Sequence, residues 1–511
     1  MSATALTSIL IWLPIAGALL IWLLPLSRYA TGSLALLFSL AEVGFWIEQA
    51  ARFDFARSGL QMEERANWFG DLGVSYHVGV YGFSLWLVGL TVVAMAACTG
   101  YGFWVGRERP RAYYGLMLLL TGATVGVFVA QDLIVFYAFF EAMLIPLYVL
   151  IGVWGGARRM EATIKLVLYT MTGSLLMLAA IVVYGLNAGT FDLVDGPASA
   201  SRWLFLGFML AFVIKAPLFP FHGWLPDAYR EAPPEVSAVL SGVIAKAGLY
   251  GMLRIAIAKF PDPTSFYRTT VLALAAAALV YGSLLAFRST NFRDVVSYSS
   301  LAQSGLIALG LFAGTDLGFD GAVLQMVAHG LISTSLFLIA GTVERRTSEY
   351  GHADRFLSLR PPVPVGESLE PVPVTVSDFR LLGGMARGRP ALATLLMTVG
   401  IISLAVPGSA SFAGEFLILA GVFQRAWWWS AIGAGAIVLA AMYILRLISA
   451  VLHEARGSTV AEEALDLRPG ELALVVPLVA GLLLLSAWPA GISHHSFFGQ
   501  SPAAAVRSQF K

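Results

Sequence analysis

Long apolar runs, separated by short polar connections, follow one another along nearly the whole chain. A helix that crosses about 30 Å of hydrocarbon needs roughly twenty apolar residues, and most of these runs have that length. The pattern predicts an all-α polytopic membrane bundle of about fourteen transmembrane helices. The predicted spans are 4–25, 31–50, 81–105, 113–130, 132–154, 161–187, 203–221, 235–258, 268–287, 295–313, 318–342, 391–423, 428–452 and 470–491.

Two of the predicted spans, the seventh and the twelfth, are interrupted by proline. The breaks are Lys215-Ala-Pro-Leu-Phe-Pro and, five helices later, Val406-Pro-Gly-Ser. Paired broken helices are typical of transporters built from inverted repeats, although a single proline is also a common kink. We expect two five-helix repeats: helices 4–8 at residues 113–258, and helices 9–13 at residues 259–452, the second with a long loop at 344–390. Helices 1–3 (1–112) precede the repeats, and helix 14 with a tail (453–511) follows them.

The composition narrows the classes of function. Of 511 residues, 58% are hydrophobic and 12% are charged, which is far from the composition of soluble domains. The net charge of +1 provides no basic surface for nucleic acid. The one cysteine, Cys98, excludes an internal disulfide and a cysteine cluster for iron–sulfur or zinc, and no phosphate loop, paired-histidine metal motif or nucleophile elbow occurs. We therefore expect partners within the lipid bilayer and no nucleotide hydrolysis.

Lysine and arginine are unevenly distributed between the two sides of the predicted bundle. If the N-terminus lies outside, the inner connections carry 19 of them and the outer connections carry 9. Cytoplasmic loops keep an excess of positive charge, so both termini are expected on the outer side of the cell membrane. The first span has no basic region before it and no cleavage site after it, and we expect it to be a retained helix.

Three ionisable residues inside predicted spans of the first half are candidates for function. Glu141 is flanked by apolar helix on both sides, Lys215 lies at the first break, and Lys246 lies in the middle of the span 235–258. Ionisable residues in the membrane are functional by default. The alternatives are a misplaced helix end or a static ion pair for Glu141, and snorkelling to the interface for the lysines.

Two further candidates lie in the second half of the chain. Glu415 follows the second break by one or two turns and is expected to be the carrier on the outer side. His329, in the span 318–342, is a natural proton relay because imidazole exchanges protons near neutral pH, or else a structural hydrogen-bond donor. Four arginines close to predicted helix ends are expected to anchor at the interface: Arg254, Arg288, Arg293 and Arg446.

Four long motifs follow one another at residues 132–148, 214–228, 239–251 and 298–305, the second reading IKAPLFPFHGWLPDA. Together they resemble the antiporter-like, proton-translocating subunits of NADH-quinone oxidoreductase (respiratory complex I), over nearly the whole chain. The resemblance implies that one charged residue in each of helices 5, 7, 8 and 12 carries protons, and the helix-12 glutamate is typical of the M type. The corresponding residues are Glu141, Lys215, Lys246 and Glu415.

The chain departs from the family pattern at three places. Arg293-Asp294 stands where many relatives have Lys-Arg, and Gln303 stands where histidine is common. The loop between helices 11 and 12, with its prolines from Pro361 to Pro373, is also longer than usual. The departures at Arg293-Asp294 and Gln303 affect the residues that would form the central proton relay of the second repeat.

The resemblance implies a proton-translocating subunit driven by NADH oxidation and quinone reduction in other subunits. FMN, iron–sulfur clusters and quinone are then expected in those partners, neighbouring antiporter-like subunits among them, and no cofactor or metal in this chain. Protons are expected to pass from an opening and closing Glu141–Lys215 pair through Lys246 to His329 and Glu415. The alternatives are a subunit of a multisubunit cation/proton antiporter, part of a proton-coupled inorganic-carbon uptake system, or a passive structural subunit.

Overall fold

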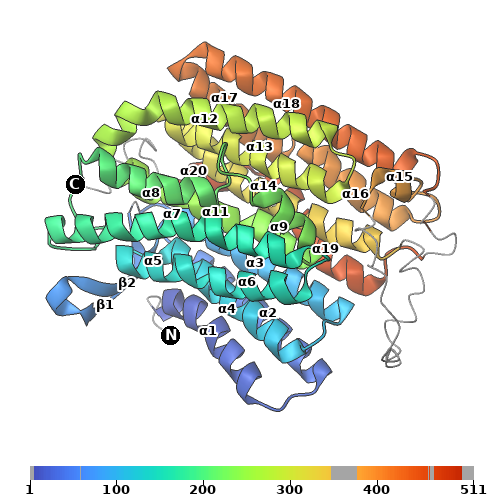
Figure 1. Ribbon diagram of the computed structural model, residues 1–511, viewed down its shortest axis with the longest axis horizontal. Coiled ribbons are helices and arrows are strands. Elements are labelled where there is room, and N and C mark those ends of the chain that lie inside the picture. The colour runs from blue at the N-terminus through green and yellow to red at the C-terminus, as the bar shows by residue number, and fades with distance from the viewer. Residues whose placement is uncertain (1–4, 58, 347–376, 458–459, 461–464, 498–511) are drawn as a thin grey trace.

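The computed structural model describes residues 5–57, 59–346, 377–457, 460 and 465–497. Long helices run side by side through the molecule, with α1 and α2 at one edge and α17 and α18 at the other (Figure 1). In the described part of the chain, twelve helices are long and apolar enough to cross a membrane, as expected for an all-α membrane bundle. In the predicted span 203–221 the helix ends early, at Lys215, and the predicted span 391–423 is split into two shorter helices. The total of fourteen counts each of these two spans as one crossing and stays a prediction.

The N-terminal part holds four helices and a β-hairpin that the sequence analysis did not predict. The hairpin pairs two antiparallel strands, and Gly73 after the turn has φ 70°, a conformation that favours glycine. Its signal was the alternation of valine with polar residues in the second strand. The elements are α1 (Ala5–Leu23), α2 (Arg28–Arg52), β1 (Gln61–Phe69), β2 (Val74–Val80), α3 (Gly82–Val105) and α4 (Pro110–Val129).

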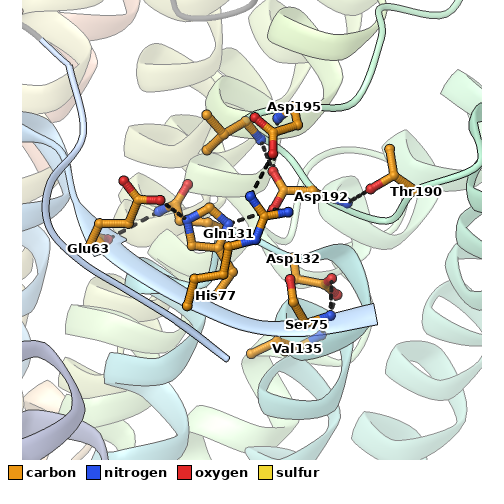
Figure 2. Close-up of polar contacts among 12 residues, drawn as sticks. Glu63, Ser75, His77, Gln131, Asp132, Val135, Thr190, Asp192 and Asp195 are labelled. Atoms are coloured by element: carbon orange, nitrogen blue, oxygen red, sulfur yellow. Dashed lines mark hydrogen bonds and ion pairs between the residues drawn. The ribbon is translucent and has the colours of Figure 1, made fainter. Parts of the chain in front are cut away.

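The hairpin lies at one end of the bundle (Figure 1). Its side chains contact the connection between α7 (Arg159–Ala188) and α8 (Arg202–Lys215), as Figure 2 shows for His77 and Asp192. His77 lies between two carboxylates, with Nδ1 2.6 Å from Oδ2 of Asp192 and Nε2 2.9 Å from Oε1 of Glu63. Arg65 adds ion pairs to Asp192 at 3.3 Å and to Asp195 at 2.6 Å. We call this end of the bundle the hairpin side and the other end the opposite side.

Asp192 is the centre of that attachment. Its burial favours the neutral acid, but hydrogen bonds from His77 and from the backbone N–H groups of Val194 and Asp195 outweigh burial. They lower the pKa of Asp192 from its ordinary value of 3.8 to about 2. Asp192 is therefore ionised over the physiological pH range.

The middle of the chain contains the first break. Asp132 caps the first helix of this part by accepting hydrogen bonds from the N–H groups of Ile134 and Val135. The helix in the seventh predicted span ends at Lys215, and helix resumes at Leu225. The helices are α5 (Leu133–Ala142), α6 (Leu144–Trp154), α7 (Arg159–Ala188), α8 (Arg202–Lys215), α9 (Leu225–Glu231), α10 (Pro234–Val239), α11 (Ala245–Gly251) and α12 (Pro261–Arg288), with π-helical segments at Leu240–Ile244 and Met252–Ile257.

The last part contains the second break, where Gly408 has φ 92° and the side chain of Ser409 caps the next helix at the N–H of Phe412. Its helices are α13 (Phe292–Ala313), α14 (Asp316–Glu344), α15 (Phe379–Leu382), α16 (Pro390–Ser403), α17 (Ala410–Arg425), α18 (Trp427–Ile448), α19 (Pro469–Ala487) and α20 (Ala490–Ser496), with a π-helical segment at Ser449–His453. The proline-rich stretch predicted at 361–373 lies outside the described residues.

Two of the spans form the centre of the bundle. The spans Pro234–Ile257 and Asp316–Glu344 are buried along their whole apolar windows. α14 packs against α3 and α10 from the first half of the chain and against α13, α17 and α19 from the second half. It therefore lies between the two halves. These two spans carry Lys246 and His329, which places both residues far from lipid.

Candidate functional site

Lys246 lies on α11, between the two π-helical segments. Its side chain is buried, and Nζ donates a hydrogen bond to the carbonyl oxygen of Ser241 at 2.7 Å. Nζ also lies 2.9 Å from Nδ1 of His329 on α14. π-helical turns occur frequently at functional sites, because the widened turn frees backbone groups. The two residues predicted to be neighbours in the relay are therefore in direct contact.

The contact between Lys246 and His329 restricts where the protons lie. Two nitrogen atoms 2.9 Å apart share one proton, because only one of them can donate. The positive charge then lies on one of the two groups: either an ammonium donates to a neutral imidazole, or an imidazolium N–H donates to a neutral amine. Moving one proton between the two nitrogens exchanges these states without any change of side-chain position.

Glu415 on α17 is held by amide groups rather than by a cation. Nε2 of Gln303 on α13 donates to Oε1 of Glu415 at 2.9 Å, and Nε2 of Gln325 on α14 donates to Oε1 of Gln303 at 2.8 Å. The other carboxylate oxygen, Oε2, is buried and has no hydrogen-bond partner within the described residues. Gly414 lets α17 approach, since a Cβ there would lie 2.5 Å from Oε1 of Gln325.

The two groups are connected along α14. His329 and Gln325 are four residues apart and lie on the same face of the helix, with Gln325 nearer the hairpin side. We call Lys246, His329, Gln325, Gln303 and Glu415 the polar axis. It joins four helices from both halves of the chain, and each of its side chains is buried.

Glu141 and Lys215 lie on neighbouring elements but are not joined directly. The ammonium of Lys215 is buried and lies 4.6 Å from the ring centroid of Phe140, within the range of a cation–π interaction. Glu141, the next residue on α5, is half-buried. No ion pair within 4.0 Å joins Glu141 and Lys215 among the residues that the structure describes, so the closed form of this pair stays a prediction.

The expectation that all four arginines anchor at the interface is wrong for two of them. Arg254 is 1% exposed and donates to Oε1 of Gln131 at 2.6 Å, because its helix end lies beneath the hairpin. Arg293 is 4% exposed and binds Glu344 at 2.7 and 2.6 Å. Sequence distance to a helix end does not reveal what covers that end.

The departure at Arg293-Asp294 forms part of an ion-pair layer on the opposite side. Arg293 binds Glu344, and Asp294 accepts two hydrogen bonds from Arg230, at 2.9 and 2.5 Å. Both geometries are bidentate, the strong and directional form of an ion pair. We define the layer by its five pairs within 2.7 Å: Arg107–Glu235, Lys165–Asp227, Arg230–Asp294, Arg293–Glu344 and Arg346–Glu471.

Two buried residues of the membrane part were not predicted as functional from the sequence. Gln303 was noted only as a departure, and its hydrogen bond to Glu415 joins positions 112 residues apart, which no local pattern reveals. Glu42 on α2 is 0% exposed and lies inside the predicted span 31–50, so its position alone was a sufficient signal. Within the described ranges, no group of three or more His, Cys, Asp or Glu side chains is arranged to hold a metal ion.

Comparisons with known proteins agree with this architecture. Residues 130–440 match the family described as NADH:quinone oxidoreductase/Mrp antiporter, TM. NADH-quinone oxidoreductase subunit M of Rickettsia prowazekii is 32% identical over 500 residues, which cover 95% of this chain and 96% of the relative.

Two solved structures are similar over 99% of this chain. A chain of respiratory complex I from Thermus thermophilus with bound NADH, itself 99% covered, has a TM-score of 0.83 and 29% identity. A chain of the Mrp complex from Dietzia sp., 100% covered, has a TM-score of 0.81 and 18% identity, a likeness of fold alone. The chain therefore belongs to the family of NADH:quinone oxidoreductase and Mrp antiporter transmembrane subunits.

Proposed function

We propose that this chain is the antiporter-like subunit, of the M type, of a proton-translocating NADH:quinone oxidoreductase. The observation that carries the proposal is the direct contact of a buried lysine with a buried histidine, Lys246 with His329, inside the membrane part. Buried ionisable groups without a countercharge are costly, and in membrane proteins they mark proton routes. Similarity to subunit M over nearly the whole chain supports the host assembly.

Proton transfer is proposed to follow the polar axis. Lys246 passes a proton to His329 through their contact, and water beside Gln325 and Gln303 carries it on to Glu415. The two amides cannot carry net charge, so their role is to orient Glu415. Glu141 and Lys215 set the field at the start of the route, since a change in their separation alters how strongly the protein favours a proton on Lys246.

The topology proposed from the sequence has support in the break geometry. α8 and α16, the helices before the two breaks, each contain 14 residues. Helices of equal length before two breaks that lie five predicted spans apart favour two inverted repeats, with the boundaries 113–258 and 259–452. The Arg and Lys distribution favours the hairpin side as the outer side, with both termini there.

Redox chemistry is proposed to take place in partner subunits, which would hold FMN, iron–sulfur clusters and quinone. This chain contributes proton transfer only. A second candidate, a subunit of a multisubunit cation/proton antiporter, is favoured by the likeness in fold to a chain of the Mrp complex. Copurification separates the two, because flavin and iron–sulfur partners support the first and their absence beside antiporter partners contradicts it.

The test compares proton pumping with NADH oxidation in reconstituted complexes of matched assembly. Lys246→Ala and Glu141→Gln are expected to abolish pumping, because the first removes the proton carrier and the second removes the charge. Lys165→Gln is the control, since Lys165 forms a half-exposed ion pair with Asp227. Normal pumping by assembled Lys246→Ala would remove the polar axis from the route.

A further inference from the structure

Glu42 is a carboxyl group inside the membrane part that the polar axis does not use. It lies on α2, in the N-terminal helices, and its side chain is 0% exposed. Neither of its carboxylate oxygens has a hydrogen-bond partner within the described residues. Buried polar groups in native proteins are bonded to protein or to ordered water, so both oxygens require an explanation.

Glu42 belongs to a polar stripe on α2. Large apolar residues of the helix, among them Leu37, Leu40 and Ile47, are exposed on its outer face. The fully buried residues of the helix are all polar or small, whereas Phe38 and Trp46, one turn before and one turn after Glu42, pack into α1 and α3. Two further buried oxygens of α2 also have no partner in the described part of the chain: Oγ of Ser39 and Oε1 of Gln49. The buried residues of α2 are Thr31, Gly32, Ala35, Ser39, Glu42 and Gln49.

The helices around α2 offer no countercharge. α1 and α3, which pack against it, contain no Asp, Glu, Lys or Arg. α4 contains only Arg111 near its start, and that guanidinium donates to the carbonyl oxygen of Leu26. An unpaired carboxylate in this position is unfavourable, whereas a neutral acid is not. Glu42 is therefore expected to hold a proton.

The polar residues of this face are distributed over the whole membrane part, with Trp46 between Glu42 and Gln49. From Thr31 to Gln49 the helix rises roughly 27 Å, close to the thickness of the hydrocarbon. At the hairpin side, Nε2 of Gln49 donates to Oγ1 of Thr7 at 3.3 Å, and Thr7 donates to the carbonyl oxygen of Met62 in the hairpin at 3.0 Å. The next residue of α1, Ser8, donates to Glu64 at 2.9 Å, so the stripe ends beside a half-buried acid.

We propose that the buried face of α2 lines a second, water-containing polar path and that Glu42 is its proton-binding site. That Glu42 holds a proton in contact with water stands on the geometry alone. That the proton moves during turnover rests on the proposed function.

Infrared spectroscopy of the whole complex tests the first statement. The difference spectrum between wild type and Glu42→Gln should contain the carbonyl stretch of a protonated acid, and deuterium oxide should shift it. Glu48→Gln, an exposed glutamate on the same helix, is the control and should show no such band. Absence of the band for Glu42, or a band insensitive to deuterium oxide, overturns the proposal. If Glu42→Gln does not assemble, Glu42→Asp should shift the band instead of removing it.

Proton pumping tests the second statement. Glu42→Gln should lower the protons pumped per NADH at least about twofold while NADH oxidation continues, and Glu42→Asp should recover part of the loss. Wild-type pumping by Glu42→Gln, with Lys246→Ala inactive, contradicts this inference alone. Wild-type pumping by Lys246→Ala contradicts the proposed function instead.

Discussion

The charged groups at the two ends of the bundle differ from those in its middle. At the ends, acids face bases: five ion pairs form the layer on the opposite side, and Asp192 with His77 and Arg65 fixes the hairpin side. In the middle, no ion pair within 4.0 Å forms at the described ionisable residues. Lys215 faces a ring, Lys246 an imidazole, Glu415 an amide, and Glu42 has no hydrogen-bond partner within the described residues.

We infer that the difference separates structural charges from the charges proposed to act in transport. A carboxylate that accepts two hydrogen bonds from an arginine stays ionised, because losing its charge breaks both bonds and leaves the arginine unpaired. A group without a countercharge is not held in one protonation state by an ion pair, so a change in a nearby charge can alter its protonation. Variants in the middle should therefore stop transport without loss of fold, and variants at the ends should do the reverse.

The largest effect is expected from Glu415→Gln. The amide keeps the shape and the hydrogen bond from Gln303 but cannot carry a proton, so pumping should fall below about a tenth of wild type at matched assembly. Glu415→Asp should retain part of the activity, because the titratable group survives on a shorter arm. Proton pumping measured beside NADH oxidation checks both, and normal pumping by the Gln variant would show that Glu415 only anchors α17.

Arg293→Leu should damage assembly rather than transport. It leaves the carboxylate of Glu344 without its bidentate partner, at a cost of about 3–5 kcal/mol. The assembled fraction and the midpoint of thermal inactivation should fall, while pumping per assembled complex stays near wild type. Arg288→Leu, at an exposed position of the neighbouring α12, should change little. If assembly is normal but pumping is lost, the ion-pair layer has a transport role.

Gln303→Leu should have an intermediate effect on transport. It removes the hydrogen bond to Glu415 and the acceptor for Gln325, a loss of about 1.5–3 kcal/mol for a bond to a charged group. Pumping should slow roughly tenfold without being abolished, because no proton carrier is lost. Gln303→Glu, which adds a second acid beside Glu415, should give a different pH profile from Gln303→Leu. Identical profiles would contradict a positioning role.

The smallest effect is expected when the pH is lowered and the attachment of the hairpin is measured. The pKa of Asp192 is lowered to about 2, so its stabilising contribution, about 2 kcal/mol, is complete above the ordinary value of 3.8 and is lost only as pH falls through about 2. Protease protection of the hairpin should therefore be unchanged between about pH 7 and about pH 4. Asp192→Asn should weaken protection over the whole range. Loss of protection in wild type above about pH 4 would show that another group controls the attachment.

Much of the architecture follows from the sequence because it depends on local properties. The length and composition of each apolar run are sufficient to identify a membrane helix, and the prolines beside Lys215 and Gly408 are sufficient to mark both breaks. Lys246 and His329 could be chosen for the same reason, since a charge or imidazole inside a hydrophobic run is visible without any contact. The hairpin was missed because β1 is mostly exposed and mixes charged with apolar residues in no regular alternation.

Which partner each buried polar or charged group contacts was decided only by the tertiary structure. Glu415 meets Gln303, 112 residues away, and Arg293 meets Glu344, 51 residues away at the far end of the next helix. The sequence records that a charge enters the membrane, which sets an energetic requirement for a partner or a proton. It does not record which helix supplies the partner, because that depends on how whole helix faces pack against one another. Helix packing therefore decided which buried charges are held in ion pairs and which have no countercharge.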